Sequence, residues 1–214
     1  MAKGKTAKDS ERPVIYLLYE GVTEKIFYEN RIIPQYLKRL NVKGRDVKGN
    51  TKLLRSTLAA SQPPFVKKGQ KLRIYCCTDN DATYKRVPDF DLEPIRNACK
   101  KEKLKNVLSV DAIVANQELE SWFFYDLDGI YDFLVVPEGK RKPKAKYKQP
   151  QRCSKEDLKT LFHKHGKSYR GGKRSTKFIK SLDIKKIVAG CKELREGIAL
   201  IKAKANDLTN DLFS

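Results

Sequence analysis

The chain has 214 residues, which is enough for one domain, or for one domain with an appendage, and for a substantial core. Its 46 Lys and Arg residues against 26 Asp and Glu residues give a formal net charge of +20 and a pI of about 9.7. Solubility does not require so large an excess, so a polyanionic partner is favoured. No run of roughly eighteen apolar residues occurs, and no basic stretch has the apolar face of an interfacial helix. We therefore expect nucleic acid, and not a membrane, as the partner.

The five cysteines are scattered, and two of them, Cys76 and Cys77, are adjacent in a predicted strand. An odd and scattered set does not indicate a disulfide framework, and it favours a reducing, cytoplasmic location. Residues 1–12 are polar and rich in Lys, without the apolar segment of a secretory signal. We expect this segment to be a disordered basic arm.

The first predicted element is a buried strand at residues 14–19, where apolar and aromatic residues follow one another without a polar interruption. Gly21 permits a tight turn, and Thr23 is placed to cap a helix that begins near Glu24. Glu20 therefore ends a core strand, at the edge of an α/β sheet where ligands bind. The simpler alternative is that Glu20 only ends the strand in water.

The elements that follow alternate between helix and strand. They are a helix at 24–40 that breaks near Pro34, a strand at 41–47, a helix at 51–60, a strand at 72–77, a helix at 92–103 and a strand at 106–115. Asp91 is placed to cap the helix at 92–103, which accounts for the acidic residues on either side of Phe90. The alternation predicts an α/β fold with a Rossmann-like parallel sheet flanked by helices.

Two more carboxylates, Asp79 and Asp81, follow the strand at 72–77. Because they are two residues apart, an extended backbone directs both side chains the same way. Their mutual repulsion is relieved by a hard cation with oxygen ligands, such as Mg²⁺ or Mn²⁺. The carboxyl ends of parallel strands meet at one edge, so Glu20 is expected to converge with this pair.

A helix predicted at 118–131 starts directly after the strand at 106–115, which places its first turn at the same edge. Glu118 lies on one flank of the apolar stripe of this helix, where exposure to solvent would suit it. Glu120 falls beside Phe124 and Leu127, so we expect it to have a partner. Both glutamates are candidates for a second metal site or for orienting the ligands of the first.

From Glu138 to Lys177 the composition becomes strongly basic, with fifteen Lys or Arg residues against three acids. Tyr and Phe side chains are interleaved among the cations, a combination that binds phosphates and stacks on bases. Proline and glycine make the segment loop-like, with one or two helical turns at 154–164, where Ser154 is a credible cap. The alternative is a disordered insert exposed to solvent. The residues expected to bind nucleic acid are Lys25, Lys144, Lys146, Lys148, Tyr169, Arg170, Lys173, Arg174 and Lys177.

Apolar residues at helical spacing continue from Thr176 to Ala205, and they predict helices that cover the core. The expected organisation has five parts: a disordered arm at 1–12, an α/β core at 13–136, a basic loop-rich insert at 137–176, C-terminal helices at 177–205 and a frayed tail at 206–214.

The strand-Glu-Gly sequence that continues as E-G-x-T-E, together with the later strand-Asp-x-Asp, resembles a Toprim domain. This metal-dependent module occurs in topoisomerases, DnaG-type primases, OLD-family nucleases and RNase M5-type maturases. Small Toprim-only bacterial proteins of the RloB-like and neighbouring groups are more similar still. They carry a proline-interrupted first helix, here Ile32 to Leu37, and an E-x-E-aromatic helix, here Glu118 to Phe124. Their Tyr-basic-Ser/Thr-Lys segment is matched loosely here by Ser168 to Lys177.

The resemblance implies hydrolysis of a phosphodiester in DNA or RNA, with Mg²⁺ or Mn²⁺ as cofactor. Asp79, Asp81 and Glu20 would hold the metal, Glu20 would act as general base or acid, and Glu118 and Glu120 would assist.

Two alternatives stay open. One is a nucleic-acid-binding or regulatory Toprim subunit without turnover. The other is RNA maturation of the RNase M5 kind or primase-type nucleotidyl transfer. The chain has no G-x-x-x-x-G-K-[ST] loop, so the ATPase that OLD nucleases carry in the same chain would be a separate ABC- or AAA-type partner here, in an antiviral or toxin-like system.

Overall fold

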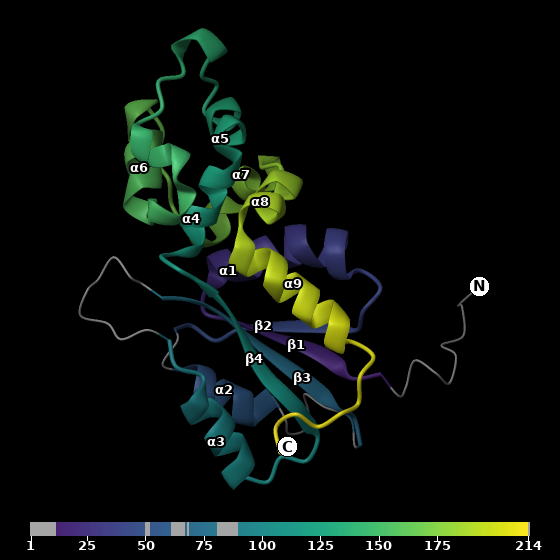
Figure 1. Ribbon diagram of the computed structural model, residues 1–214. Coiled ribbons are helices and arrows are strands. Elements are labelled where there is room, and N and C mark those ends of the chain that lie inside the picture. The colour runs from purple at the N-terminus through teal and green to yellow at the C-terminus, as the bar shows by residue number, and fades with distance from the viewer. Residues whose placement is uncertain (1–11, 50–51, 61–66, 68, 81–89, 214) are drawn as a thin grey trace.

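The computed structural model describes residues 12–49, 52–60, 67, 69–80 and 90–213. Its centre is one sheet of four strands in the order β2-β1-β3-β4, and every neighbouring pair is parallel (Figure 1). The strands are β1 (Val14–Tyr19), β2 (Val42–Asp46), β3 (Leu72–Asp79) and β4 (Val107–Ala115). The predicted α/β fold with a Rossmann-like parallel sheet is confirmed.

Helices connect and cover these strands. Those before β4 are α1 (Val22–Phe27), α2 (Leu53–Ala60), α3 (Glu93–Lys101) and the π-helix η2 (Tyr28–Leu37), which contains Pro34. Those after β4 are α4 (Leu119–Phe123), α5 (Leu127–Phe133), α6 (Lys155–Lys164), α7 (Thr176–Ser181), α8 (Ile184–Gly190) and α9 (Lys192–Lys204). In the described residues, no helix combines the length and the apolar character needed to cross a lipid bilayer.

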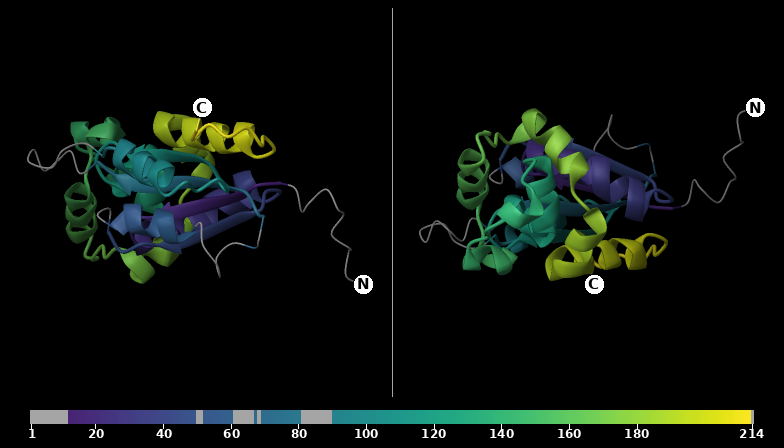
Figure 2. Two further views of the ribbon diagram at one scale, coloured as in Figure 1. Left: turned by 90° about the horizontal axis from the view of Figure 1, so that it is seen from below. Right: turned by 90° about the horizontal axis from the view of Figure 1, so that it is seen from above.

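Alternate residues of β1 pack on opposite faces of the sheet, as the period of two in a strand requires. Ile15, Leu17 and Tyr19 belong to a large apolar cluster with α1, η2 and the helices after β4. Val14 and Leu18, on the other face, pack with α2 and α3. Figures 1 and 2 show the resulting layers, with α1 and α9 on one side of the sheet and α2 and α3 on the other. Both faces are thus covered, as in doubly wound folds.

The order of the strands creates a switch point between β1 and β3. The chain leaves β1 for β2 through α1 and η2 on one face, and it leaves β3 for β4 through α3 on the other. The carboxyl ends of β1 and β3 are therefore neighbours whose connections diverge, and such an arrangement opens a crevice at which α/β proteins bind ligands. The sequence places Glu20 and Asp79 at these two strand ends.

Helices α4–α8 form a helical lobe beyond the sheet (Figure 1). The basic segment belongs to this lobe and is not a solvated insert, because its Tyr147, Phe162 and Tyr169 are buried in the same apolar cluster as β1. The ring of Phe162 packs edge-on against that of Phe178 in α7, with 5.1 Å between the ring centroids. As predicted, Ser154 caps α6, in a reciprocal capping box with Asp157. The remainder of the segment contains short 3₁₀ turns.

The C-terminal tail was expected to fray, but the structure fastens it to the sheet. Leu212 is buried, and its N–H donates to the carbonyl of Leu108 over 3.0 Å. The Arg73 side chain of β3 is fully buried, and its guanidinium donates to the Thr209 carbonyl and to Asp211 Oδ2, each over 3.0 Å. Sequence reasoning missed Arg73, since a single Arg within a predicted strand gives no sign of a partner more than a hundred residues away.

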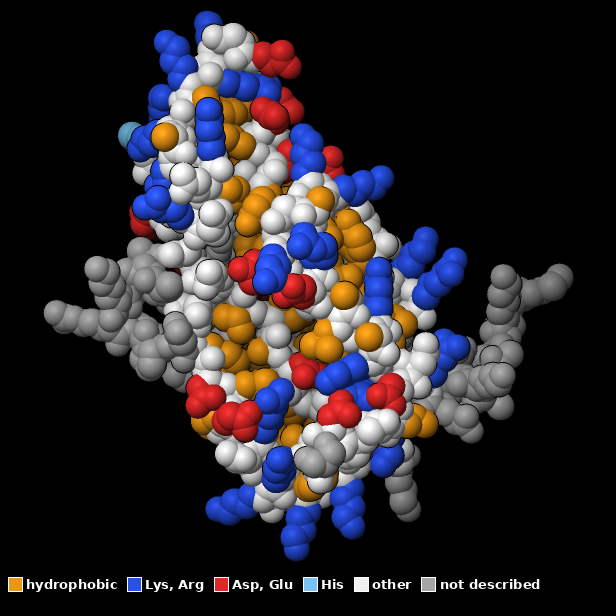
Figure 3. Space-filling view, in the orientation of Figure 1, with side chains coloured by type: hydrophobic (Ala, Val, Ile, Leu, Met, Phe, Trp, Pro, Cys, Tyr) orange, Lys and Arg blue, Asp and Glu red, His pale blue; other side chains and the backbone are white. Residues whose placement is uncertain are grey.

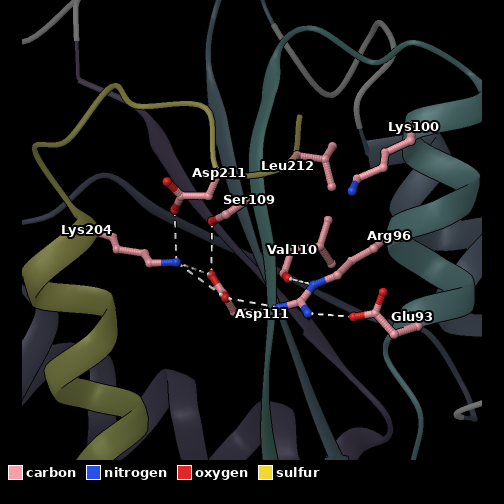
Figure 4. A pocket seen from close by; sticks show the side chains of 9 residues that line it. All are labelled: Glu93, Arg96, Lys100, Ser109, Val110, Asp111, Lys204, Asp211 and Leu212. Atoms are coloured by element: carbon pink, nitrogen blue, oxygen red, sulfur yellow. Dashed lines mark hydrogen bonds and ion pairs between the residues drawn. The ribbon is translucent and has the colours of Figure 1, made fainter. Parts of the chain in front are cut away.

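A polar cavity of about 230 Å³ lies beside the middle of β4, between α3 and α9 (Figure 4). Arg96 of α3 and Lys204 of α9 reach Asp111 from opposite sides, at 3.6 Å and 3.4 Å. Lys204 also pairs with Asp211 at 3.0 Å. The carboxylates of Asp111 and Asp211 in the cavity wall are thus paired with basic side chains of the same wall. The cavity is therefore lined in part by the residues that attach the C-terminal tail to the sheet.

The buried guanidinium gives a first testable prediction. Asp211→Asn should destabilise the protein, because it removes a carboxylate from a fully buried cation. The Asp211 side chain is 35% exposed, so we expect a loss of about 1 kcal/mol, or roughly 2–4 °C in melting temperature. Adding Arg73→Met should recover part of this loss, since the buried cation is then removed together with its carboxylate partner. Asp128→Asn, at an ion pair on the surface, is the control. Equal melting of the single and the double variant would contradict this account.

Candidate active site at the carboxyl edge of the sheet

Glu20 and Asp79 meet at the switch point, and hydrogen bonds hold both in place. Glu20 Oε2 accepts a hydrogen bond from the Thr78 hydroxyl and another, of 3.1 Å, from the Asp79 N–H. Asp79 Oδ1 in turn accepts the Leu119 N–H at the start of α4, over 2.9 Å. The ends of β1 and β3 and the start of α4 are thus joined through carboxylates. The predicted convergence of Glu20 with Asp79 is observed, whereas Asp81 lies outside the described residues.

Glu118 and Glu120 lie at the same edge, and both have partners in the basic segment. Glu118 is the extended residue just before α4, and its Oε2 accepts the Lys155 N–H over 2.8 Å. Glu120 is 1% exposed; its Oε1 accepts the Tyr169 hydroxyl over 3.0 Å and lies 3.4 Å from Lys155 Nζ. The expectation that Glu120 has a partner is confirmed, and both partners come from the segment predicted as an insert.

Glu24 is a further acid of this site, and sequence reasoning treated it only as the start of a helix. It is 8% exposed, and burial raises the pKa of its carboxyl to about 7, helped by the negative charges of Glu120 and Glu20 and opposed by Lys155. The signal was present in the E-G-x-T-E sequence, because a residue four positions after Glu20 lies in the first turn of the helix over the strand end.

Thr23 does not cap α1, which has Gly21 at its N-cap and no side-chain cap. Its hydroxyl oxygen instead accepts the Gly172 N–H over 2.8 Å. A Cβ atom on Gly171 would lie 3.0 Å from Thr23 Oγ1 and 3.8 Å from Glu120 Oε1. The two glycines thus let the backbone of the basic segment approach the acids closely, and this segment forms one wall of the site.

Most of the residues predicted to bind nucleic acid lie at the surface, but Tyr169 does not. Arg170, Lys173, Arg174 and Lys177 are exposed and flank the glycines that touch Thr23. Tyr169 is buried and donates to Glu120, so its ring is not available to stack on a base.

The other predicted cations differ in how they are engaged. Lys25 is half-buried on α1, and Lys144 lies 5.9 Å from the centre of the Tyr147 ring. Lys146 pairs with Asp157 at 2.5 Å, while Lys148 is exposed. Figure 3 shows Lys and Arg side chains distributed over the helical lobe.

The described residues contain no group of three or more His, Cys, Asp or Glu side chains arranged to hold a metal ion. The two candidate donors at the switch point are the carboxylates of Glu20 and Asp79, and Glu20 Oε2 accepts the backbone N–H of Asp79. A pair of this kind suits Mg²⁺, which keeps several waters and commonly takes only one or two carboxylates from a protein, with the rest from substrate phosphates.

The fold and this edge define the molecule as a doubly wound α/β protein with a group of acidic residues at its switch point. The chain belongs to the family described as "Domain of unknown function (DUF4276)", whose model matches residues 19–198. The match runs from the last residue of β1 into α9 and therefore includes the acids and the basic segment alike. No curated protein and no solved structure matched the chain.

The burial of Glu24 gives a second prediction. Its folded-state pKa of about 7 lies above the ordinary 4.5, so the stability it contributes is present below about pH 4.5 and is lost as pH rises through 7. Glu24→Gln cannot ionise, so its melting temperature should exceed that of wild type at about pH 8, by several degrees. The two proteins should differ little at about pH 4.5. Glu29→Gln, at an exposed glutamate of η2, is the control. A constant difference at every pH would contradict the assignment.

Proposed function

We propose that this protein is a Mg²⁺-dependent nuclease that hydrolyses a phosphodiester in DNA or RNA at a Toprim-like site. The observation that supports this most directly is the contact of Glu20 with Thr78 and Asp79 across the switch point. The Glu20 carboxylate is held there against the backbone N–H of Asp79, beside the buried acids Glu24 and Glu120, and the repulsion among neighbouring carboxylates favours a bound cation. The resemblance of E-G-x-T-E and the Asp-x-Asp sequence to Toprim domains supports the same conclusion.

In this proposal Glu20 and Asp79 hold the ion, with Asp81 a third candidate ligand from the sequence. When bound, Mg²⁺ neutralises charge on the scissile phosphate and lowers the pKa of a coordinated water. The protein orients the carboxylates: the Thr78 hydroxyl and the Leu119 N–H each occupy one lone-pair direction and thereby fix the side-chain rotamers. Glu20 is also the candidate general base or acid.

The exposed cations beside the site support nucleic acid as the substrate. Arg170, Lys173 and Arg174 follow one another closely and frame the glycines next to Thr23 and Glu120. Because Tyr169, Phe162 and Tyr147 are buried, these cations would hold the polymer through its phosphates and not by stacking on its bases.

Loss of the strand-end acids tests the proposal. Glu20→Gln and Asp79→Asn should each lower cleavage by a hundredfold or more, because each removes a metal ligand or a general base. The assay offers plasmid, single-stranded DNA, tRNA and rRNA with Mg²⁺, Mn²⁺ or EDTA, and melting curves verify that each variant folds. Glu93→Gln, at an exposed glutamate of α3, is the matched control. Full activity in both folded site variants would place the catalytic site elsewhere.

Salt dependence tests the basic surface. The logarithm of the affinity for nucleic acid should fall with the logarithm of salt concentration with a slope of several units. The double variant Lys173→Glu with Arg174→Glu should reduce that slope by roughly one unit for each lost phosphate contact. The same reversal at Lys100 and Lys101 of α3 is the control and should leave the slope nearly unchanged. Equal slopes in the two double variants would remove this surface from the binding site.

A second candidate is a nucleic-acid-binding or regulatory subunit that does not turn over, acting with a separate ABC- or AAA-type ATPase. It is favoured by the partners that Glu118 and Glu120 already have, since an acid paired within the protein needs no metal. Binding of nucleic acid that is equally strong in Mg²⁺ and in EDTA, with no cleavage of any substrate, would support this candidate over the nuclease.

A further inference from the structure

Val135, the second residue after α5, is both strained and exposed. Its side chain is 79% exposed, the highest value among the large apolar residues that the structure describes. Its backbone φ of 61° lies in the left-handed region, where a β-branched residue is an outlier. The conformation costs folding free energy, and the exposed side chain returns none of it by burial. Stability alone therefore favours a different residue at this position.

The same helix ending occurs after α3 and α6, which allows a direct comparison. In α5 the Val136 N–H donates to the Tyr131 carbonyl over 3.0 Å, the long bond of a Schellman motif. The corresponding left-handed residues are Lys103 after α3, with a φ of 52°, and Gly166 after α6, with a φ of 71°. Glycine adopts this conformation without strain, and lysine is unbranched at Cβ and extends its charge into water. Val135 has neither advantage.

The residues next to Val135 already provide what the fold needs at this helix end. Leu134 and Val136 are 4% and 6% exposed and belong to the large apolar cluster. The apolar contact that accompanies a Schellman motif is made by the residue after the left-handed position, which is Val136 here. The ending of α5 is thus complete without the Val135 side chain, and that side chain is left for a contact outside the chain.

Basic side chains bracket Val135 and bind the carbonyl groups beside it. Lys167 Nζ donates to the Phe133 carbonyl over 2.7 Å and lies 4.9 Å from the centre of the Phe133 ring. Arg141 Nε donates to the Val136 carbonyl over 3.1 Å. Carbonyl groups at the C-terminus of a helix repel anions. Here cationic donors engage two of them, so an anion can approach Val135 more closely.

The chain that follows Val135 is rich in positive charge. Residues 136–149 contain six Lys or Arg residues and one acid, Glu138. Arg141 pairs with two aspartates of α5, which fastens this segment to the helix end. Lys140 and Lys142, on either side of Arg141, are exposed and have no acidic partner among the described residues. In Figure 1 this segment forms the tip of the helical lobe. The tip therefore combines an exposed apolar side chain with exposed cations.

We propose that Val135 contacts the face of an unpaired base in the bound nucleic acid, while the lysines at the lobe tip hold the neighbouring phosphates. A single strand presents an anionic backbone together with apolar base faces, and this surface is complementary to both. The inference rests on the proposed binding of nucleic acid. It adds a base contact that the buried aromatic rings of the basic segment cannot make. An anionic membrane fits less well, because one valine is far smaller than the apolar face of an interfacial helix.

The substitution Val135→Gly tests this proposal by melting curves and by binding to single-stranded DNA and RNA of about 20 nucleotides at several salt concentrations. Relief of the strain should raise the melting temperature by roughly 2–4 °C. The affinity should fall about fivefold to tenfold at every salt concentration, because an apolar contact is lost. The slope of affinity against salt should stay unchanged, because no charge is removed. Val135→Asn, which also tolerates a left-handed backbone, should behave like the glycine variant, and Val135→Ile should keep the affinity.

Lys103→Gly is the matched control, because it relieves the same strain at the end of α3. It should also melt at a higher temperature, and its affinity should change by no more than about twofold. Unchanged affinity in folded Val135→Gly, with wild type binding nucleic acid, would overturn the role of Val135 and leave the proposed function standing. A lower melting temperature for Val135→Gly would show that the side chain serves the fold, and would overturn it as well.

Wild type without affinity for any nucleic acid would overturn the proposed function and this inference together. Binding to phosphatidylserine vesicles that depends on Val135 would in that case assign the tip of the lobe to a membrane surface.

Discussion

The concentration of carboxylates at the carboxyl ends of parallel strands is the constraint on which this structure depends. A parallel sheet brings strand ends together whatever side chains they carry, and here the sequence supplies Glu20 and Asp79 at the two ends that flank the switch point. Neither acid is simply exposed to water. Each accepts hydrogen bonds from the neighbouring element, and the donors are mostly backbone groups that the fold already places there. The sheet thus brings the mutually repelling carboxylates close to one another and also supplies some of the hydrogen-bond donors that stabilise them.

The basic segment supplies the rest of the compensation, which explains why it is folded. Its Gly172 N–H binds Thr23, its Tyr169 hydroxyl binds Glu120, and the start of α6 binds Glu118. The rings of Tyr169 and Phe162 are buried against α7, so the polar contacts are attached to an apolar anchor. If charge alone determined its structure, so basic a segment would remain unfolded in water. Burial of its aromatic rings and its contacts with Glu118 and Glu120 instead stabilise the folded arrangement.

The sequence was sufficient for the features set by local pattern. Apolar residues predicted the four strands, in continuous runs for β1 and β3 and in interrupted ones for β2 and β4. Their alternation with helices predicted the parallel sheet, and the ends of β1 and β3 pointed to Glu20 and Asp79. The predictions that were wrong concern residues whose partners are distant in the sequence. Arg73 is neutralised by a tail more than a hundred residues later, and Thr23 binds Gly172 instead of capping its own helix. Periodicity describes how one element meets solvent and core, and it contains no information on which remote segment supplies a counter-charge.

The same reasoning explains why the aromatic residues of the basic segment were misassigned. Tyr and Phe among lysines have the composition of a base-stacking surface, but they have equally the composition of a small core whose helices present their charged faces to water. Spacing alone does not distinguish the two. In the structure the rings of Tyr147, Phe162 and Tyr169 are buried, and the Tyr169 hydroxyl donates a hydrogen bond to Glu120.

The net charge of the whole molecule also affects how the acidic residues at the switch point would bind a cation. With an excess of twenty positive charges, the surface potential attracts polyanions and repels free divalent cations. In the proposed nuclease, a cation at Glu20 and Asp79 would have to be held by direct contact with the carboxylates, because the long-range field opposes it. A bound polyanion reverses this field locally and brings phosphate oxygens as further ligands. Under the proposed function, the binding of metal and the binding of nucleic acid would strengthen each other, since each supplies the charge that the other lacks.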